Sequence, residues 1–215
     1  MCGGDLHLLR VFFCASKGAP GLASHLTERD RWIAWDCFEF RVLTTSQITR
    51  LYFTGTRTAA ARLDVLYRLR ALDRFRPSLP MGQGTAPYHW ILDEAGALIV
   101  ADHLDIERAK LGWQHSIAAG IAHSQKLPHH VEVNEFFTRL AVEANVAGGA
   151  LSEWYGERTC HHFFSGYLVA DGYGVSISRA AGLCTSWSSW TEAPRQPDGY
   201  ARRPGHTRLS CLPAP

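Results

Sequence analysis

The chain has 215 residues, of which 46% are hydrophobic and 20% are charged, and its formal net charge is +2. These values are ordinary for a globular protein with a buried core, and such a net charge by itself identifies no nucleic-acid partner. The six cysteines form no CxxC pair, which excludes a zinc-ribbon pattern and gives no disulfide framework. We therefore expect a reducing, cytoplasmic location, and no segment has the roughly 18 uninterrupted apolar residues that a membrane-spanning helix needs.

Residues 1–24 contain an apolar run that is similar to the core of a signal peptide. Arg10 splits this run and Lys17 follows it, which weakens that interpretation. We expect instead a disordered leader, or a start codon placed upstream of the true one, with the folded part of the chain beginning near residue 25.

The first folded segment predicts three short helices joined by tight turns. The first covers residues 28–40, with Thr27 as its N-cap and acidic residues in its first turn. Thr44 or Thr45 caps a shorter second helix, and a third helix follows the turn at Gly55. This arrangement is typical of a helix-turn-helix unit.

A β-hairpin is predicted directly after the third helix. Residues 72–77 and 87–93 have strand character, and a loop rich in proline and glycine separates them. A fourth helix follows, for which Asp93 is the expected N-cap. A hairpin in this position is the wing of a winged helix-turn-helix domain, which we predict over residues 25–105.

Arginines are concentrated in the third helix and in the strand that follows it. In a helix-turn-helix the start of this helix faces the major groove, where arginine reaches guanine edges while other cations pair with phosphates. A solvated arginine-rich helix, or a winged helix that docks proteins, remains an open alternative. The candidate DNA-binding residues are Arg57, Thr58, Arg62, Arg68, Arg74, Arg76 and the wing residue Gln83.

A second domain is predicted in the C-terminal half of the chain. A strong helix begins near Pro128 and ends before two glycines, and residues 151–160 and 166–175 then have strand character. A helix followed by strands favours an α/β domain, so the fold class of the whole chain is α+β. The expected segments are a helical connector over residues 106–127, a partial α/β domain over 128–175 and an irregular tail over 176–215.

Five segments resemble the replication-relaxation family, which is found on plasmids and mobile elements of high-GC Gram-positive bacteria. In chain order they are LTERDRWIAWDCFEFRVLTTSQITRLYF, RTAAARLDVLYRLRALDRFRP, PYHWILDEAGA, HHVEVNEFF and ADGYG. The resemblance covers residues 26–175. It implies an N-terminal winged helix, a C-terminal domain similar to the PD-(D/E)xK nuclease fold, and an association with plasmid DNA replication and relaxation of supercoiled DNA.

The resemblance also implies three candidate catalytic carboxylates. Glu135 matches the family's helix acid, Glu157 matches the acid of a W-x-x-E-R strand, and Asp171 matches the aspartate of the PDG motif, where Ala170 replaces the proline. Such carboxylates bind Mg²⁺ and activate water for attack on a phosphodiester, which makes Asp171 and Glu135 the candidate metal ligands. The acidic strand that comes next in the family is absent in this reading frame, so we do not expect this chain to be an active enzyme.

The run CTSWSSWTEAP at residues 184–194 stands where that acidic strand is expected. Its codons, read from one nucleotide earlier, permit VHLLVELDRGT, an apolar strand that ends in the family's acidic motif. We therefore interpret residues 176–215 as an out-of-frame tail, with chance agreement through the free codon positions as the alternative. Even the restored strand has aspartate where the nuclease pattern has lysine.

The sequence thus predicts a DNA-binding protein of plasmid replication, DNA relaxation or mobile-element maintenance. Its expected partners are duplex DNA and plasmid replication or transfer proteins, with no membrane. One alternative is a Mg²⁺-dependent nuclease that nicks or relaxes DNA, and Mg²⁺ is an expected cofactor only if the nuclease-like site is intact. The other alternative is a winged-helix adaptor that binds protein and not DNA.

Overall fold

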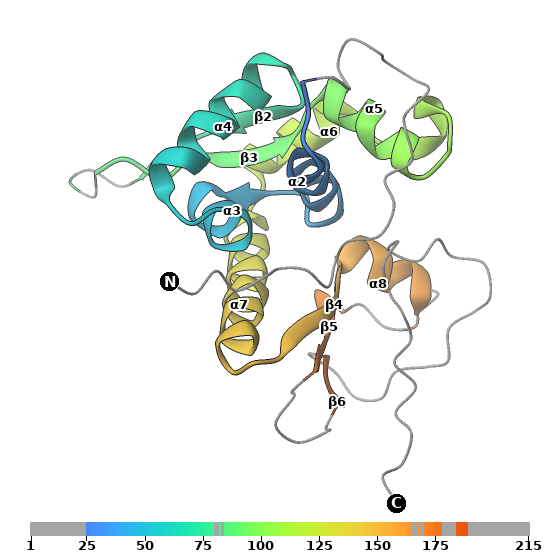
Figure 1. Ribbon diagram of the computed structural model, residues 1–215. Helices are drawn as coiled ribbons and strands as arrows, with labels where there is room; N and C mark the ends of the chain where they lie inside the picture. The colour runs from blue at the N-terminus through green and yellow to red at the C-terminus, as the bar shows by residue number, and fades with distance from the viewer. Residues whose placement is uncertain are drawn as a thin grey trace, which may run out of the picture. The chain divides into compact units, whose positions relative to one another are not determined.

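A computed structural model describes residues 25–79, 82, 84–164, 167 and 170–177, together with the backbone of residues 184–188. These residues combine helices with two three-stranded antiparallel sheets, which confirms the predicted α+β class (Figure 1). They fall into two compact units that divide inside a long helix, since the first unit ends at Thr138 and the second begins at Arg139. The predicted leader lies outside the described residues.

Three helices open the first unit: α2 (Glu28–Glu39), α3 (Thr45–Tyr52) and α4 (Thr56–Arg68). The expected cap Thr27 forms a capping box with Asp30, whose carboxylate accepts a hydrogen bond from the Thr27 backbone N–H at 2.7 Å. Thr44 and Gln47 make the same reciprocal pair at the start of α3. Such boxes satisfy backbone N–H groups that a helix start leaves unpaired, and they fix where α2 and α3 begin.

Three strands form the sheet of the first unit: β1 (Leu43–Thr44), β2 (Leu72–Phe75) and β3 (His89–Leu92). Their order is β1-β3-β2, and both pairings are antiparallel. The predicted hairpin is confirmed as β2 and β3, which pair from Leu72 opposite Leu92 to Phe75 opposite His89. The sequence does not predict β1, because two residues between helices are too few to show an alternating pattern.

The core of the first unit lies between this sheet and the apolar faces of its helices. Ile33 of α2, Leu63 of α4 and Trp90 of β3 are almost completely buried. The indole N–H of Trp90 donates to the hydroxyl of Thr45 at 2.8 Å, so its polar atom is satisfied inside the core. Burying one large apolar side chain contributes about 1.5–3 kcal/mol, so these residues help to hold the helices on the sheet.

Helix α5 (Glu94–His103) follows β3 directly, and Asp93 is its N-cap as expected. Gly96 in its first turn approaches the chain that leads into β2. A Cβ atom on Gly96 would lie 2.1 Å from the backbone carbonyl oxygen of Ala71, which is far inside van der Waals contact. Glycine is therefore required for α5 to pack in this position.

The predicted helical connector consists of short helices that lead into a long one. The segments are η2 (Arg108–Leu111), α6 (His115–Gly120), η3 (Ile121–His123) and α7 (Leu127–Val146). Ile121 and Leu127 share a buried cluster with Val42 and Ile91 of the preceding elements. Asn134 of α7 is also buried and donates to the carbonyl of Val42 at 2.7 Å. The first unit thus includes α7 up to Thr138.

The second unit contains β4 (Ala150–Gly156), α8 (Glu157–Phe163), β5 (Gly172–Ile177) and β6 (Cys184–Ser188). Its strands lie in the order β4-β5-β6, and both pairs are antiparallel. The end of α7 leads into β4 through Gly148, whose φ of 75° is in the left-handed region that glycine adopts without strain.

Two expectations for the second unit are corrected. The strand predicted over residues 151–160 ends at Gly156, because helix α8 begins at Glu157. The tail predicted to be irregular from residue 176 includes the end of β5 and the whole of β6. Strand pairing supplies backbone hydrogen bonds whatever the side chains are, so a tryptophan- and serine-rich run pairs with β5 although its composition has no strand alternation.

Candidate nucleic-acid interface

Helix α4 buries one face and exposes the opposite one. Its buried residues are Ala59, Leu63 and Leu66. Among its exposed residues, four follow one another at a spacing of three or four along the helix: Arg57, Ala61, Val65 and Arg68. The exposed side chain of Arg57 has no hydrogen bond or ion pair with any residue that the structure describes. Thr58 is also exposed, and its hydroxyl donates to the carbonyl of Gly55 at 2.8 Å.

Arg62 is turned away from this exposed face by an ion pair with α2. Its Nε donates to Oδ1 of Asp30 at 3.0 Å, and its Nη2 donates to Oδ2 at 2.5 Å and to the carbonyl of His25 at 2.8 Å. The Asp30 side chain is 0% exposed. Burial alone would raise the pKa of Asp30, but hydrogen bonds from Arg62 and Thr27 outweigh it and hold the pKa below its usual value. The structure thus gives Arg62 a structural partner on α2, and its groove contact stays a prediction.

The hairpin arginines are stacked on tyrosine rings. The guanidinium carbon of Arg74 lies 4.4 Å from the ring centroid of Tyr67 on α4 and 4.4 Å from that of Tyr88 before β3. The guanidinium carbon of Arg76 lies 3.8 Å from the Tyr88 centroid. Contacts of this kind combine electrostatic attraction to the ring face with planar stacking. The remaining wing candidate, Gln83, lies outside the described residues.

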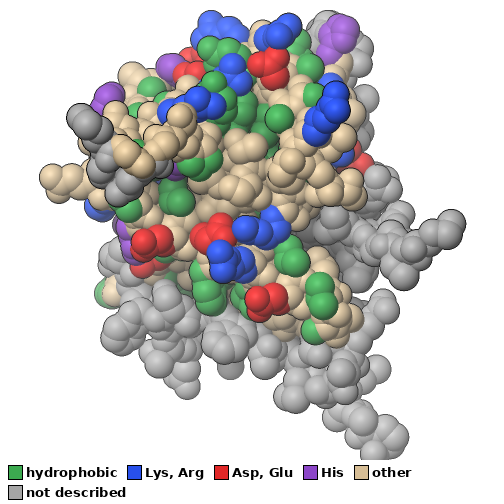
Figure 2. Space-filling model, turned by 90° about the vertical axis from the view of Figure 1, so that its left-hand side faces the viewer, with side chains coloured by type: hydrophobic (Ala, Val, Ile, Leu, Met, Phe, Trp, Pro, Cys, Tyr) green, Lys and Arg blue, Asp and Glu red, His purple; other side chains and the backbone are tan. Residues whose placement is uncertain are grey.

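Asp64 of α4 connects the helix arginines to the hairpin arginines. Its carboxylate oxygens lie 2.9 Å from Nη2 of Arg68 and 3.5 Å from Nη1 of Arg74. The Arg68 side chain is 78% exposed, so the first of these pairs contributes little to stability. The hairpin between β2 and β3 projects away from the helices in Figure 1. Figure 2 looks from that side and shows, on its upper part, Lys and Arg side chains beside hydrophobic ones, with Asp or Glu side chains and histidines among them.

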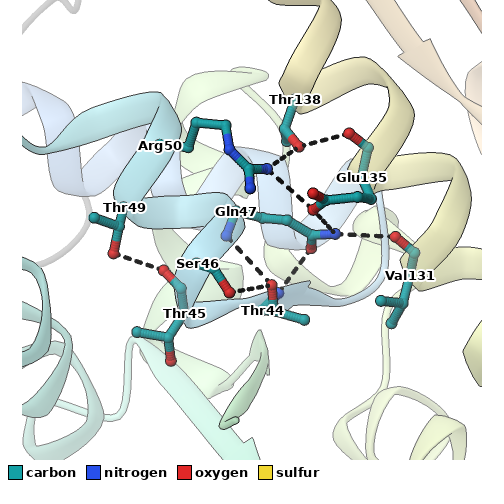
Figure 3. Close-up of polar contacts among 9 residues, drawn as sticks. All are labelled: Thr44, Thr45, Ser46, Gln47, Thr49, Arg50, Val131, Glu135 and Thr138. Atoms are coloured by element: carbon teal, nitrogen blue, oxygen red, sulfur yellow. Dashed lines mark hydrogen bonds and ion pairs between the residues drawn. The ribbon is translucent and has the colours of Figure 1, made fainter. Parts of the chain in front are cut away.

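Glu135, the candidate acid of the nuclease-like part, lies in the first unit and contacts α3 (Figure 3). Its Oε2 accepts hydrogen bonds from Nη1 of Arg50 at 3.0 Å and from Nε2 of Gln47 at 3.4 Å. The same Arg50 nitrogen donates to the hydroxyl of Thr138 at 3.0 Å, and Gln47 also donates to the carbonyl of Val131 at 2.9 Å. Glu135 therefore takes part in the attachment of α7 to α3.

The other two candidate carboxylates lie in the second unit. Glu157 is the first residue of α8, directly after β4, and Asp171 directly precedes β5. Their neighbours Gly156 and Gly172 face each other across the two strands. The register therefore brings Glu157 and Asp171 to the same end of the β4–β5 pair, where both are partly buried.

The candidate Mg²⁺ ligands Glu135 and Asp171 lie in different units, and their metal role stays a prediction. Among the residues that the structure describes, no group of three or more His, Cys, Asp or Glu side chains is placed to hold a metal ion. Glu135 is held by a guanidinium and an amide in the first unit, and Glu157 and Asp171 lie in the second unit. Because Mg²⁺ requires several oxygen ligands in an octahedral arrangement, we derive no chemical step through it.

Sequence reasoning missed two tyrosines of the basic surface. Tyr67 lies in the predicted third helix and Tyr88 in the predicted hairpin. A search for charged residues does not select them as DNA-binding candidates, because their rings carry no charge. Strand alternation could have identified Tyr88. Once the register of the hairpin is known, this tyrosine lies on the same face as Arg74 and Arg76. Tyr67 reaches that face only through tertiary packing.

Of the comparisons with known proteins, the one with family sequence models gives a match. No curated protein and no solved structure matches the chain. None of the helices that the structure describes is long and apolar enough to cross a membrane. The sequence model of the replication-relaxation family matches residues 37–188, most of the chain, as the resemblance implied. The protein therefore belongs to the replication-relaxation family.

Proposed function

We propose that this protein binds duplex DNA through its first unit and acts in the replication or relaxation of plasmid or mobile-element DNA. Membership of the replication-relaxation family supports the biological role. The observation that carries the DNA-binding part is the exposed, arginine-bearing face of α4, next to a hairpin that carries further arginines. A protein needs such cations because the phosphate backbone supplies most of the affinity for DNA.

The order of elements supports a winged helix-turn-helix in this unit. Helices α3 and α4 follow each other through a short turn at Gly55, and the hairpin of β2 and β3 comes directly after α4. Strand β1 adds to the free side of β3 and completes a small sheet. In helix-turn-helix proteins the second helix of the motif enters the major groove with its N-terminal residues at the base edges. Here that helix is α4.

The exposed residues of α4 match the chemistry of a major groove. Arg57 in the first turn has the bidentate donor geometry that guanine O6 and N7 accept, and the adjacent Thr58 hydroxyl bonds to either bases or phosphates. Ala61 and Val65 continue the same face with small apolar groups, which suit the methyl group of thymine. Arg68, near the end of the helix, extends the face with a cation for the phosphate backbone.

Titration of the full-length chain with fluorescent duplex DNA, followed by anisotropy at several salt concentrations, tests this proposal. We expect Arg57→Ala to weaken specific binding by about 1–3 kcal/mol, since each bidentate base contact contributes that much discrimination. Lys110→Ala is the matched control, because Lys110 is also exposed and its removal changes the net charge equally, but it lies on η2.

Equal binding by Arg57→Ala and Lys110→Ala would overturn the role of α4. If the wild-type chain captures a replication or transfer protein but shows no salt-dependent DNA binding, the adaptor hypothesis replaces the DNA-binding one. Circular dichroism of each variant verifies that the fold is retained, which we expect because both side chains are exposed.

A further inference from the structure

The arginine and tyrosine side chains between α4 and the hairpin form a continuous stack. The guanidinium group of Arg74 is equidistant from two tyrosine rings, at 4.4 Å from Tyr67 and 4.4 Å from Tyr88. The guanidinium group of Arg76 then lies 3.8 Å from the same Tyr88 ring. The order Tyr67–Arg74–Tyr88–Arg76 joins a helix to both sides of the hairpin, and we call it the arginine–tyrosine stack.

The two arginines of the stack have different surroundings. Arg74 is 24% exposed, has aromatic partners that include Trp90 at 5.5 Å, and lies 3.5 Å from the carboxylate of Asp64. These contacts hold its guanidinium group in place, and Arg74 shares the single negative charge of Asp64 with Arg68. Arg76 is exposed, and none of the residues that the structure describes supplies it with an anionic partner. The Tyr88 ring lies against its guanidinium group, and the side chain as a whole is exposed to solvent.

We propose that Arg76, held flat on Tyr88, binds a backbone phosphate of the same nucleic acid that α4 contacts, while Arg74 and Tyr67 position the Tyr88 ring. This inference rests on the proposed function. It assigns the phosphate contact to Arg76 and a positioning role to Arg74 and Tyr67. Stacking restricts the guanidinium plane before binding, so less conformational entropy is lost when its donors meet a phosphate.

The charge of Arg76 and its connection to α4 through the arginine–tyrosine stack favour a phosphodiester backbone as the ligand of Arg76. The guanidinium donors match the oxygens of a phosphate in a bidentate manner. The stack also begins on α4 itself, at Tyr67, so a chain of phosphates beside the α4 face lies next to Arg76. An acidic peptide offers carboxylates of similar geometry, and the experiment below distinguishes the two.

The experiment measures binding of the full-length protein to duplex DNA of several unrelated sequences across a range of salt concentrations. We expect Arg76→Ala to weaken binding to all sequences alike and to reduce the slope of log K against log salt by about 0.9, the value for one lost phosphate contact in B-DNA. Arg76→Lys keeps the charge but loses the stacked plane, and we expect an intermediate affinity with a slope close to wild type.

A second set of variants tests the positioning role of Tyr88, which carries no charge. Tyr88→Leu is expected to weaken binding severalfold with unchanged net charge, and Tyr88→Phe, which keeps the ring, is expected to restore it. A purely structural role for Tyr88 predicts a loss of thermal stability with DNA affinity unchanged at temperatures where the variant is folded, and that result would overturn the positioning assignment. Arg76 is exposed, so its variants test the inference even if Tyr88→Leu fails to fold.

The failure of this inference is distinguishable from failure of the proposed function. If Arg57→Ala weakens binding while Arg76→Ala behaves like the Lys110→Ala control, the stack is not a phosphate site and the α4 proposal stands. If neither variant affects DNA binding but Arg76→Ala abolishes binding of a poly-glutamate peptide, the occupant is an acidic peptide and the phosphate assignment is rejected.

Discussion

Glu135 on α7 accepts a hydrogen bond of 3.0 Å from Arg50 on α3, although 85 residues separate them in the chain. The contact places a carboxylate with a predicted catalytic role inside the unit proposed to bind DNA. Gln47, which caps α3, reaches the same carboxylate oxygen and the α7 backbone at Val131. Helix α7 is therefore joined to the helix that precedes α4, and the proposed DNA-binding unit extends as far as Thr138.

Removal of the Glu135 carboxylate should lower stability modestly. In Glu135→Ala, Arg50 and Gln47 lose a shared acceptor, but the Arg50 and Glu135 side chains are 28% and 30% exposed, so water compensates in part. We expect a loss of about 1 kcal/mol in the free energy of unfolding, measured by urea denaturation, and a smaller loss for Glu135→Gln. A variant as stable as wild type would show that this contact does not hold α7 on α3.

Arg62→Ala should destabilise the protein much more than Arg57→Ala. Loss of the Arg62 guanidinium leaves the carboxylate of Asp30 buried without its cation, and such a loss costs roughly 3 kcal/mol. Arg57 has no such partner among the described residues, so its alanine variant should unfold at the wild-type urea concentration. Equal unfolding midpoints would contradict the structural role assigned to Arg62.

The same ion pair gives a stability that depends on pH. Burial would raise the pKa of Asp30, but its hydrogen bonds with Arg62 and Thr27 lower it below the ordinary value near 3.9. A carboxyl whose pKa is lower in the folded state stabilises the fold above the unfolded pKa, and this contribution is lost as pH falls through the folded pKa.

We therefore expect the free energy of unfolding to decrease as pH is lowered below about 4. The lowered pKa of Asp93, where hydrogen bonds from Arg70 and Glu94 outweigh burial, acts in the same direction. In Arg62→Ala the Asp30 contribution should shrink, because only the Thr27 hydrogen bonds then oppose the effect of burial, so a series of urea titrations between about pH 3 and 6 should show a shallower decline than wild type. An identical decline in both proteins would refute the assignment to Asp30.

Gly96→Ala should be one of the most damaging single substitutions in the first unit. The added Cβ would lie 2.1 Å from the Ala71 carbonyl oxygen and 2.5 Å from Cδ1 of Leu92, so α5 must move away from the hairpin. We expect a loss of several kcal/mol, that is, more than about 2 kcal/mol. Gly120→Ala is the control, because no atom lies within 4 Å of a Cβ at that helical position. Its melting temperature should equal or slightly exceed that of wild type.

Supercoiled plasmid incubated with this chain and Mg²⁺ should remain intact. The expectation follows from the sequence, in which the family's next acidic strand is absent from this reading frame. Agarose gels measure the conversion to nicked circles. Nicking that Asp171→Asn abolishes, with circular dichroism unchanged, would show that the nuclease hypothesis is the correct one.

The helices and hairpin of the first unit could be predicted from sequence because their signals are local. Thr27, Thr44 and Asp93 are capping residues immediately before apolar periodic segments, and each proves to be an N-cap. Strand β1 and the start of α8 could not be predicted in the same way. Two residues carry no period, and Glu157 follows an apolar alternation that gives no sign of where the strand ends.

The candidate binding surface could be predicted in composition but not in detail. A count of arginines shows a basic segment, but it does not separate Arg62, which pairs with a buried aspartate, from Arg57, which faces solvent. The distinction depends on a partner 32 residues away on another helix. The surroundings of Glu135 could not be predicted for the same reason. The family motif identifies the residue as a glutamate, but only tertiary packing shows that it contacts Arg50 on α3.

The salt dependence of duplex DNA binding by the full-length chain tests the central claim most directly. If α4 and the hairpin bind DNA, log K falls linearly as log salt rises, and Arg57→Ala weakens binding while Lys110→Ala does not. A binding constant that does not change with salt, or the absence of any retention of duplex DNA at low salt, would contradict the account.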